Sequence, residues 1–239
     1  MFKSCIRNKK AFTLAEVLIT LGIIGIVAAL TIPTLIKDYK RAVSIAKLKK
    51  TYSVLQQAIQ RTVADNLGYS SVNFSDGDTQ SMIDWYNYYL KPNLRIQKDC
   101  IDVVGCWHSD GTTKQLNGNT AIWDSGKKGI GGNIIVFRTF DNVYVNLDGA
   151  AATDIQNNFG VNMDESGLVL HVDVNGDEGP NVIGQDIFVF VFNNKLLVPA
   201  GNDKSNEEIE RDCSKDGRGY YCFSYIIRNN WKINDNMIL

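Results

Sequence analysis

A long apolar segment near the amino terminus constrains this chain more than any other feature. Residues 12–36 read FTLAEVLITLGIIGIVAALTIPTLI and contain a single charged side chain, Glu16. An apolar helix of roughly 20 residues is long enough to cross the hydrocarbon core of a bilayer. A carboxylate inside such a helix is costly, so an acid kept at that position indicates a function. We therefore expect a membrane helix whose acid has a specific partner.

The segment differs from an ordinary secretory signal peptide. Such a signal has about 7 to 15 apolar residues followed by a small-residue cleavage site. Here the apolar run is longer, and the small-residue junction Ala11–Phe12 precedes it. Cleavage there would remove a basic leader, residues 1–11, and keep the apolar helix. By the positive-inside rule, the leader's cations keep the amino terminus in the cytoplasm and the bulk of the chain outside. These cations are Lys3, Arg7, Lys9 and Lys10.

Residues 9–16, KKAFTLAE, resemble the processing signal of type IV pilins and of the pseudopilins of type II secretion systems. The resemblance implies that a prepilin peptidase cuts between Ala11 and Phe12 and N-methylates Phe12. It also implies that Glu16 pairs with the amino group of a neighbouring subunit in a fibre. Pro33 resembles the helix-breaking proline that many members carry. One difference is Ala11, because the family usually has Gly before the cut.

The same resemblance implies a structural subunit, a pseudopilin or minor pilin, of a type II secretion or type IV pilus-like filament. Its partners are then other pilin-type subunits, the prepilin peptidase, the membrane platform of the assembly machine and membrane lipid. It would begin as a single-pass protein of the cytoplasmic membrane and end in a periplasmic or cell-surface filament. The alternative is a membrane-anchored extracytoplasmic binding or adhesin domain that does not polymerise, in which Glu16 is a tolerated acid near the lipid headgroups.

The helical pattern continues beyond the apolar segment. In residues 37–66 apolar side chains recur at steps of three and four, which predicts the amphipathic second half of one long helix. Pro33 is expected to kink or locally unwind this helix, and Gly68 to follow its end. Four parts are therefore expected: a leader (1–11), a membrane half of the helix (12–36), an amphipathic half (37–66) and one globular head (67–239).

Strand periodicity replaces helical periodicity within the head. A second, shorter helix is predicted between Asp78 and Pro92. After residue 120, runs rich in Val, Ile and Phe are joined by tight turns such as Asp141-Asn142, which predicts an antiparallel meander. The predicted fold is α+β, with the long helix packed against an antiparallel sheet. The expected strands are residues 134–140, 143–147, 168–174, 187–192 and 195–198.

Four cysteines remain once Cys5 leaves with the leader. An even number suits disulfide formation outside the cytoplasm. Three connectivities are possible, and two local bridges are favoured because short loops close most readily. A zinc site is the rival interpretation, but the spacings are not of the CxxC type and the two histidines lie far apart. The favoured pairs are Cys100–Cys106 and Cys213–Cys222.

Residues 171–186 have the oxygen spacing of the first half of a calcium loop. The segment lacks the glycine and the glutamate that an EF-hand requires at fixed positions, so the alternative is a plain turn between two strands. Major pseudopilins carry a calcium site in a loop beside the sheet, so the family resemblance adds weight to calcium. The candidate ligands are Asp173, Asn175, Asp177 and Asp186.

Neither catalysis nor nucleic-acid binding is indicated. The sequence contains no P-loop, no GxSxG and no HExxH motif, and neither His108 nor His171 has an evident nucleophile. With a formal net charge of −1 the chain lacks the basic patch that nucleic acid requires. We therefore expect a mechanical role and no enzymatic activity.

Overall fold

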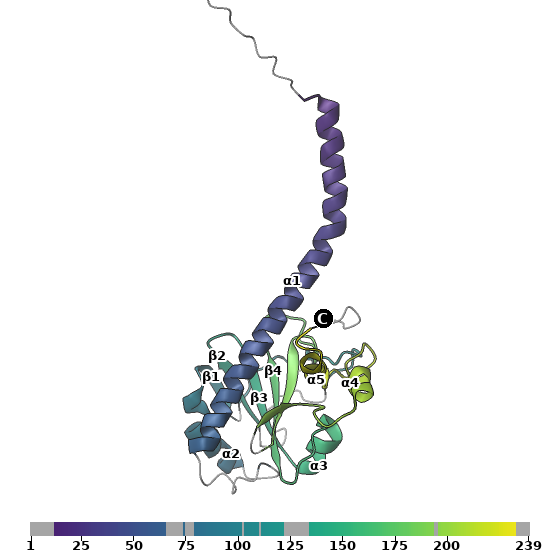
Figure 1. Ribbon diagram of the computed structural model, residues 1–239. Helices are drawn as coiled ribbons and strands as arrows, with labels where there is room; N and C mark the ends of the chain where they lie inside the picture. Colours follow the sequence, from purple (N-terminus) through teal and green to yellow (C-terminus); the bar gives the residue numbers. More distant parts are fainter. Residues whose placement is uncertain are drawn as a thin grey trace, which may run out of the picture. The chain divides into compact units, whose positions relative to one another are not determined.

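The computed structural model describes residues 12–65, 74, 79–101, 103–109, 111–121, 134–193 and 196–232 (Figure 1). The chain forms two compact units, residues 1–43 and residues 44–239. The boundary between them lies inside one helix, α1, Leu14–Asp65. The apolar half of this helix and residues 37–43 therefore belong to the first unit, and the rest of the amphipathic half belongs to the second.

In the first unit, α1 presents its apolar side chains to the surroundings. Most of the large ones between Leu14 and Ile36 are half-exposed or more. The mean hydropathy of the best window is 2.3, so α1 is long and apolar enough to cross a membrane. The helix runs through Pro33 without interruption, so it does not unwind there.

In the second unit, α1 is amphipathic as predicted. One stripe packs against the sheet, and Leu48, Leu55 and Ile59 on that stripe are at most 2% exposed. Helix packing on a sheet buries the apolar face, while the polar side chains remain in solvent. The described part of the helix ends at Asp65. The predicted end at residue 66 and the expected stop at Gly68 lie outside the described residues.

Six strands form one antiparallel sheet within the described residues, in the order β1-β2-β3-β4-β5-β6. Each strand pairs with its sequence neighbours, although only the β2–β3 and β5–β6 connections are short. Asn142 in the turn between β2 and β3 has φ 58°, a left-handed conformation that Asn tolerates. The strands are β1 Ile96–Ile101, β2 Ile134–Thr139, β3 Tyr144–Ala150, β4 Gly167–Asp173, β5 Ile187–Phe192 and β6 Leu197–Pro199.

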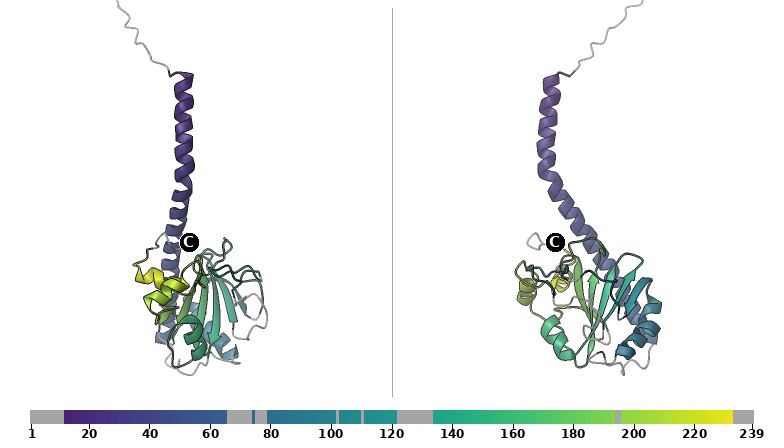
Figure 2. Two further views of the ribbon diagram at one scale, coloured as in Figure 1. Left: turned by 90° about the vertical axis from the view of Figure 1, so that its right-hand side faces the viewer. Right: turned by 180° about the vertical axis from the view of Figure 1, so that it is seen from behind.

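The two faces of the sheet are covered differently. Residues 44–65 of α1, the head-bound half of this helix, lie across one face together with α5, Cys222–Arg228 (Figures 1 and 2). Loop residues cover the other face, among them Val161, Ile183 and Tyr220, together with Ile155, Phe159 and Ile209 from short helical segments. Strand β5, which is apolar on both faces, is therefore fully buried. Phe188, Phe190 and Phe192 face the helix, and Ile187, Val189 and Val191 face the loops.

The predicted α+β fold is confirmed, and the differences concern elements with weak sequence patterns. Strand β1 was not predicted because IQKDCI has no apolar alternation; it is an edge strand with an irregular register at Ile96/Lys98. Strand β3 extends three residues beyond the predicted end, and Lys195, the predicted start of β6, lies outside the described residues.

Several short helices complete the head. The helix predicted between Asp78 and Pro92 is present in three successive pieces, although Asp78 itself is outside the described residues. Two further short helices and one helical turn were not predicted from the sequence. The pieces are α2 Thr79–Trp85, η2 Tyr86–Leu90 and η3 Lys91–Asn93, and the additional elements are α3 Ala152–Asp154 with η4 Ile155–Phe159, α4 Asn206–Asp212, and α5.

Candidate functional site at the start of the long helix

The first turn of α1 is closed by two polar side chains, Thr13 and Glu16. The main-chain N–H and the hydroxyl of Thr13 both donate to Glu16 Oε2, each at 2.8 Å. In return, Glu16 N–H donates to Thr13 Oγ1 at 3.2 Å. This reciprocal arrangement is a capping box, in which the residue before the helix and the third helical residue satisfy each other's main-chain N–H groups. Glu16 therefore has a role within its own helix.

Glu16 lies at the beginning of an exposed apolar surface. Phe12 is 86% exposed and Leu14 is 79% exposed, and neither is covered by other described residues. Apolar side chains in such number require lipid or another protein around them. Ala11 lies outside the described residues, so the structure describes only the Phe12 side of the predicted cleavage site.

The head-bound half of α1 also blocks one edge of the sheet. Tyr52 donates its hydroxyl hydrogen to the main-chain oxygen of Leu197 at 3.2 Å, and Leu197 N–H donates to Gln56 Oε1 at 3.2 Å. These contacts satisfy main-chain groups of edge strand β6, which otherwise invite pairing with another chain. Lys50 Nζ lies 3.0 Å from Asp141 Oδ2 in the β2–β3 turn. The helix is thus fixed to the sheet by directed bonds as well as by apolar packing.

The cysteines are paired as predicted. Cys100 and Cys106 form a disulfide with 5.8 Å between their Cα atoms, and Cys213 and Cys222 form one with 4.8 Å. The first closes the loop that follows β1, and Arg138 Nε donates to the main-chain oxygen of Cys106 at 3.0 Å. The second connects the end of α4 to the start of α5. Both bridges therefore hold segments that have few strand or helix hydrogen bonds of their own.

Three of the four predicted calcium ligands meet in the loop between β4 and β5. Asp173 Oδ1 accepts the N–H of Asn175 at 2.8 Å. Asp186 Oδ2 accepts from the side chain of Asn175 at 3.2 Å and from the N–H of Asn181 at 2.8 Å. The side-chain oxygens of Asn175 and Asn181 are buried and receive no hydrogen bond. Two buried carboxylates and two amide oxygens without donors are oxygen ligands of the type that calcium takes, so these residues fit the ion.

The two buried carboxylates of this loop lie close enough to interact electrostatically. Burial raises the pKa of Asp186 to about 6, and the charge of Asp173 adds to the rise. His108 is the partner of the other carboxylate, since its Nε2 lies 2.6 Å from Asp173 Oδ2. Among the described residues, no group of three or more Asp, Glu, His or Cys side chains is arranged to hold a metal. A calcium site here therefore depends on amide oxygens.

Asp177, the fourth predicted ligand, has other partners. Its carboxylate accepts a hydrogen bond from the Tyr144 hydroxyl and lies 3.9 Å from Arg138 Nη1. The side chain is 72% exposed, unlike those of the two other carboxylates. Asn181 takes the place of Asp177 among the candidate calcium ligands. Its main-chain N–H donates to Asp186, a contact that depends on how the loop folds back and that the sequence spacing does not reveal.

The loop-covered face of the sheet contains buried titratable groups. Burial raises the pKa of Asp148 to about 7, with a further contribution from the charge of Asp154. Burial lowers the pKa of His171 to about 4. The His171 ring lies 6.0 Å from the ring of Phe159 and 6.5 Å from that of Tyr220. His171 is thus a neutral core side chain at neutral pH, and nothing in these contacts activates a nucleophile.

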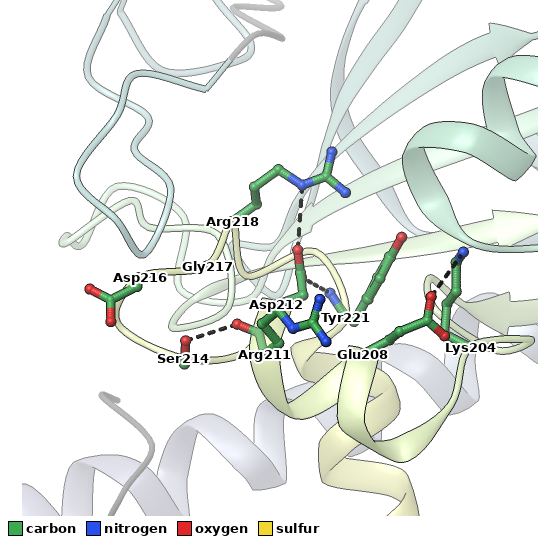
Figure 3. Close-up of a pocket in the computed structure, with 9 residues that line it drawn as sticks. All are labelled: Lys204, Glu208, Arg211, Asp212, Ser214, Asp216, Gly217, Arg218 and Tyr221. Atoms are coloured by element: carbon green, nitrogen blue, oxygen red, sulfur yellow. Dashed lines mark hydrogen bonds and ion pairs between the residues drawn. The ribbon is translucent and has the colours of Figure 1, made fainter.

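A pocket of about 430 Å³ opens between α4 and the loop that leads to α5 (Figure 3). Its lining is mostly charged, and the opposite charges pair with each other. Lys204 Nζ lies 3.4 Å from Glu208 Oε1, and Arg218 Nε lies 3.4 Å from Asp212 Oδ1. The lining also contains Arg211 and Asp216, so three cations and three carboxylates surround the pocket.

Sequence reasoning identified Glu16 but missed Thr13. The signal was present, because a Ser or Thr followed three residues later by Glu, directly before an apolar run, is the pattern of a capping box. Thr13-Leu14-Ala15-Glu16 carries both patterns, because the acid belongs to the pilin-type motif and also closes the cap of the helix.

Two protein-family models match the chain. A model described as the prokaryotic N-terminal methylation motif matches residues 6–32, and a model described as a family of unknown function (DUF6613) matches residues 34–120. No curated protein and no solved structure gives a significant match. The first model covers the predicted cleavage site, the capping box and most of the exposed apolar surface.

Proposed function

Because the chain carries a type IV pilin-like prepilin signal, we propose that it is a pseudopilin or minor pilin of a type II secretion or type IV pilus-like filament. Prepilin peptidase cuts between Ala11 and Phe12 and methylates the new amino terminus. The mature chain then leaves the cytoplasmic membrane and joins a helical fibre through α1. Its role in that fibre is mechanical and not catalytic.

The observation that carries this proposal is the position of Glu16. Its carboxylate is on the first turn of a helix whose apolar side chains are exposed. Both Thr13 donors use Oε2, and among the described residues no hydrogen bond reaches Oε1. One oxygen is therefore free to accept from the amino group of Phe12 in the next subunit.

Pairing across subunits has a clear energetic basis. An unpaired carboxylate and an unpaired ammonium are both costly in hydrocarbon or in the dry core of a fibre. When Glu16 of one subunit meets the amino terminus of another, each charge relieves the cost of the other. Only one axial offset between subunits allows that contact, so the pair sets the register of assembly.

The orientation follows from the charges of the leader. Four cations precede the apolar segment, so the uncut amino terminus stays in the cytoplasm by the positive-inside rule. The head then lies outside, where its disulfides are stable. In this compartment we propose that calcium binds Asp173, Asn175, Asn181 and Asp186 and stabilises the β4–β5 loop, while neighbouring subunits and the assembly platform bind the helix.

The experiment examines processing and assembly in cells that contain the prepilin peptidase and the parent machine. Intact-mass analysis should show loss of residues 1–11 and one added methyl, and sheared surface filaments should contain the chain. An intact amino terminus would contradict the proposed processing. Processed protein that is found only in the membrane would support the alternative, an anchored binding domain that does not polymerise.

A further inference from the structure

We propose that the basic side of α1 within the head, defined by Lys47 and Lys50, binds helix α4 of a second copy of this chain. This inference rests on the proposed function, because copies meet in a filament. Lys47, Lys50 and Val54 follow one another at steps of three and four residues, so they lie on one side of the helix. Lys47 is partly exposed, the Lys50 side chain is 62% exposed and Val54 is 44% exposed. This side of the helix is therefore accessible to a partner.

Charge is divided unequally between α1 and the rest of the head. Residues 44–64 contain four Lys and Arg and no Asp or Glu, whereas residues 66–239 contain 14 Lys and Arg and 23 Asp and Glu. Surfaces of opposite potential favour association and fix the orientation in which two proteins meet. A chain with a basic helix on an acidic head therefore has the charge that complements another copy of itself.

Helix α4 provides the acidic counterpart. Glu207 and Glu210 are exposed, and among the described residues neither lies within ion-pair distance of a cation. The two glutamates are three residues apart, as are Lys47 and Lys50, so each pair spans about one helical turn. Two helices that lie side by side can therefore form both ion pairs at once.

The contacts within one copy leave this pairing open. Figure 1 shows α5 between α4 and the head-bound half of α1. Lys50 Nζ lies 3.0 Å from Asp141 Oδ2, but the side chains are 62% and 65% exposed. An ion pair this exposed to water contributes little to stability. Lys50 can therefore exchange Asp141 for a carboxylate of another copy, where a second ion pair forms beside the first.

The positions of the lysines favour a protein partner over lipid phosphate. Lys47 follows Ile36, the last residue of the apolar segment, by 11 residues. That distance is about 16 Å of helix. The headgroup region of one leaflet is only about 5 to 8 Å thick. Lys47 and Lys50 are therefore too far along the helix for lipid to be their main partner.

The test measures sheared filaments from full-length variants in cells that contain the prepilin peptidase and the parent machine. Lys47→Glu/Lys50→Glu and Glu207→Lys/Glu210→Lys should each lower the yield about tenfold at equal membrane levels, because two attractive pairs become repulsive. The variant with all four changes should recover most of the yield, since both pairs are restored with their charges exchanged.

Arg95→Glu/Lys98→Glu is the matched control. These two residues are exposed and three positions apart, and their replacement changes the net charge by the same amount, but they lie outside α1. This variant should assemble like the wild type. Equal melting temperatures of all variants would show that each head is folded.

Cross-linking of wild-type filaments gives an independent measurement. A carbodiimide, which joins a carboxylate to an amine in direct contact, should produce covalent dimers. Peptide mapping of these dimers should find Lys47 or Lys50 joined to Glu207 or Glu210.

Wild-type yields from the glutamate variant, no recovery when all four charges are exchanged, or filaments without this cross-link would overturn the inference and leave the proposed function in place. A loss of filaments in the lysine variant alone would assign the lysines to lipid phosphate instead. A wild type that forms no filaments would contradict the proposed function itself, and this inference with it.

Discussion

Tyr52 and Leu197 are 145 residues apart in the sequence, and the hydroxyl of Tyr52 donates a hydrogen bond to the main-chain oxygen of Leu197 at 3.2 Å. The bond connects the head-bound half of α1 to the edge strand of the sheet. Any force transmitted along α1 in a fibre reaches the head through contacts of this kind. The connection between helix and head is therefore part of the proposed mechanical function.

Tyr52→Phe should lower the free energy of unfolding by about 1 kcal/mol, the typical net contribution of one hydrogen bond. The ring contacts with Phe190 and Phe223, at 5.9 and 5.1 Å between centroids, remain in this variant. Urea denaturation of the full chain in mild detergent measures the change. Tyr88→Phe is the control, because Tyr88 is 74% exposed. Equal losses in both variants would contradict the assigned role of the Tyr52 hydroxyl.

Removing the bridge between Cys213 and Cys222 should destabilise the head by about 2 to 3 kcal/mol, since a short loop loses its cross-link in the unfolded chain. The double variant Cys213→Ala/Cys222→Ala avoids an unpaired thiol. Denaturation without reductant measures the loss, and peptide mapping of the exported wild-type protein under non-reducing conditions checks the pairing. Bridges between the Cys100–Cys106 and Cys213–Cys222 pairs, or four free thiols, would be inconsistent with the structure.

Asp148 should make the head less stable as the pH rises. Its pKa is raised from 3.8 to about 7, so between these values the unfolded chain is ionised while the folded protein retains the proton. The folded state binds more protons in that window, and stability falls as the pH increases through it. Asp148→Asn should therefore stabilise the head at pH 8, by about 4 kcal/mol, and have little effect at pH 4.

The control for this pH dependence is Asp154→Asn. Asp154 is exposed, and its charge contributes to the raised pKa of Asp148. This variant should give a smaller gain at pH 8 and none when Asp148 is already Asn. Thermal melts between pH 4 and pH 8 decide the matter, and a gain from Asp148→Asn that is the same at both ends of the range would count against the assignment.

Millimolar calcium should raise the melting temperature of the protein, because a ligand that binds only the folded state stabilises it. Extracellular modules bind calcium with dissociation constants of about 10⁻⁴ to 10⁻³ M. The rise should disappear in Asn181→Ala and persist in Asp177→Asn, because the structure places Asn181 with the candidate ligands and gives Asp177 other partners. No rise in the wild type up to about 10 mM calcium would leave the loop as a hydrogen-bonded turn.

The sequence predicted those parts of the fold that carry a strong apolar pattern. The long helix and strands β2 to β5 have clear periods, because one or both faces are buried. Strand β1 has no such pattern, because it lies at the sheet edge with mostly polar side chains. Helices α4 and α5 are short and depend on a capping box at Ser205 and on the bridge between Cys213 and Cys222, so local apolar spacing did not predict them.

The candidate site was predictable to a similar degree. Glu16 and the cysteine pairs follow from charge in an apolar run and from short spacing. The proximity of Asn181 to Asp186 follows from the path of the loop and could not be read from the spacing. The role of Thr13 could have been predicted, because the capping pattern is local. The same four residues, 13–16, also belong to the pilin-type motif, which accounts for Glu16 without reference to Thr13.

The most direct test of the account is filament assembly by Glu16→Gln at equal membrane levels. The variant keeps the shape of the side chain and the capping box but removes the charge that pairs with the neighbouring amino group. We expect it to insert and to be cleaved like the wild type, and to yield no sheared filaments and no secretion by the parent machine. Wild-type yields of filaments and secretion from Glu16→Gln would contradict the account and would leave Glu16 as a helix cap in an anchored domain.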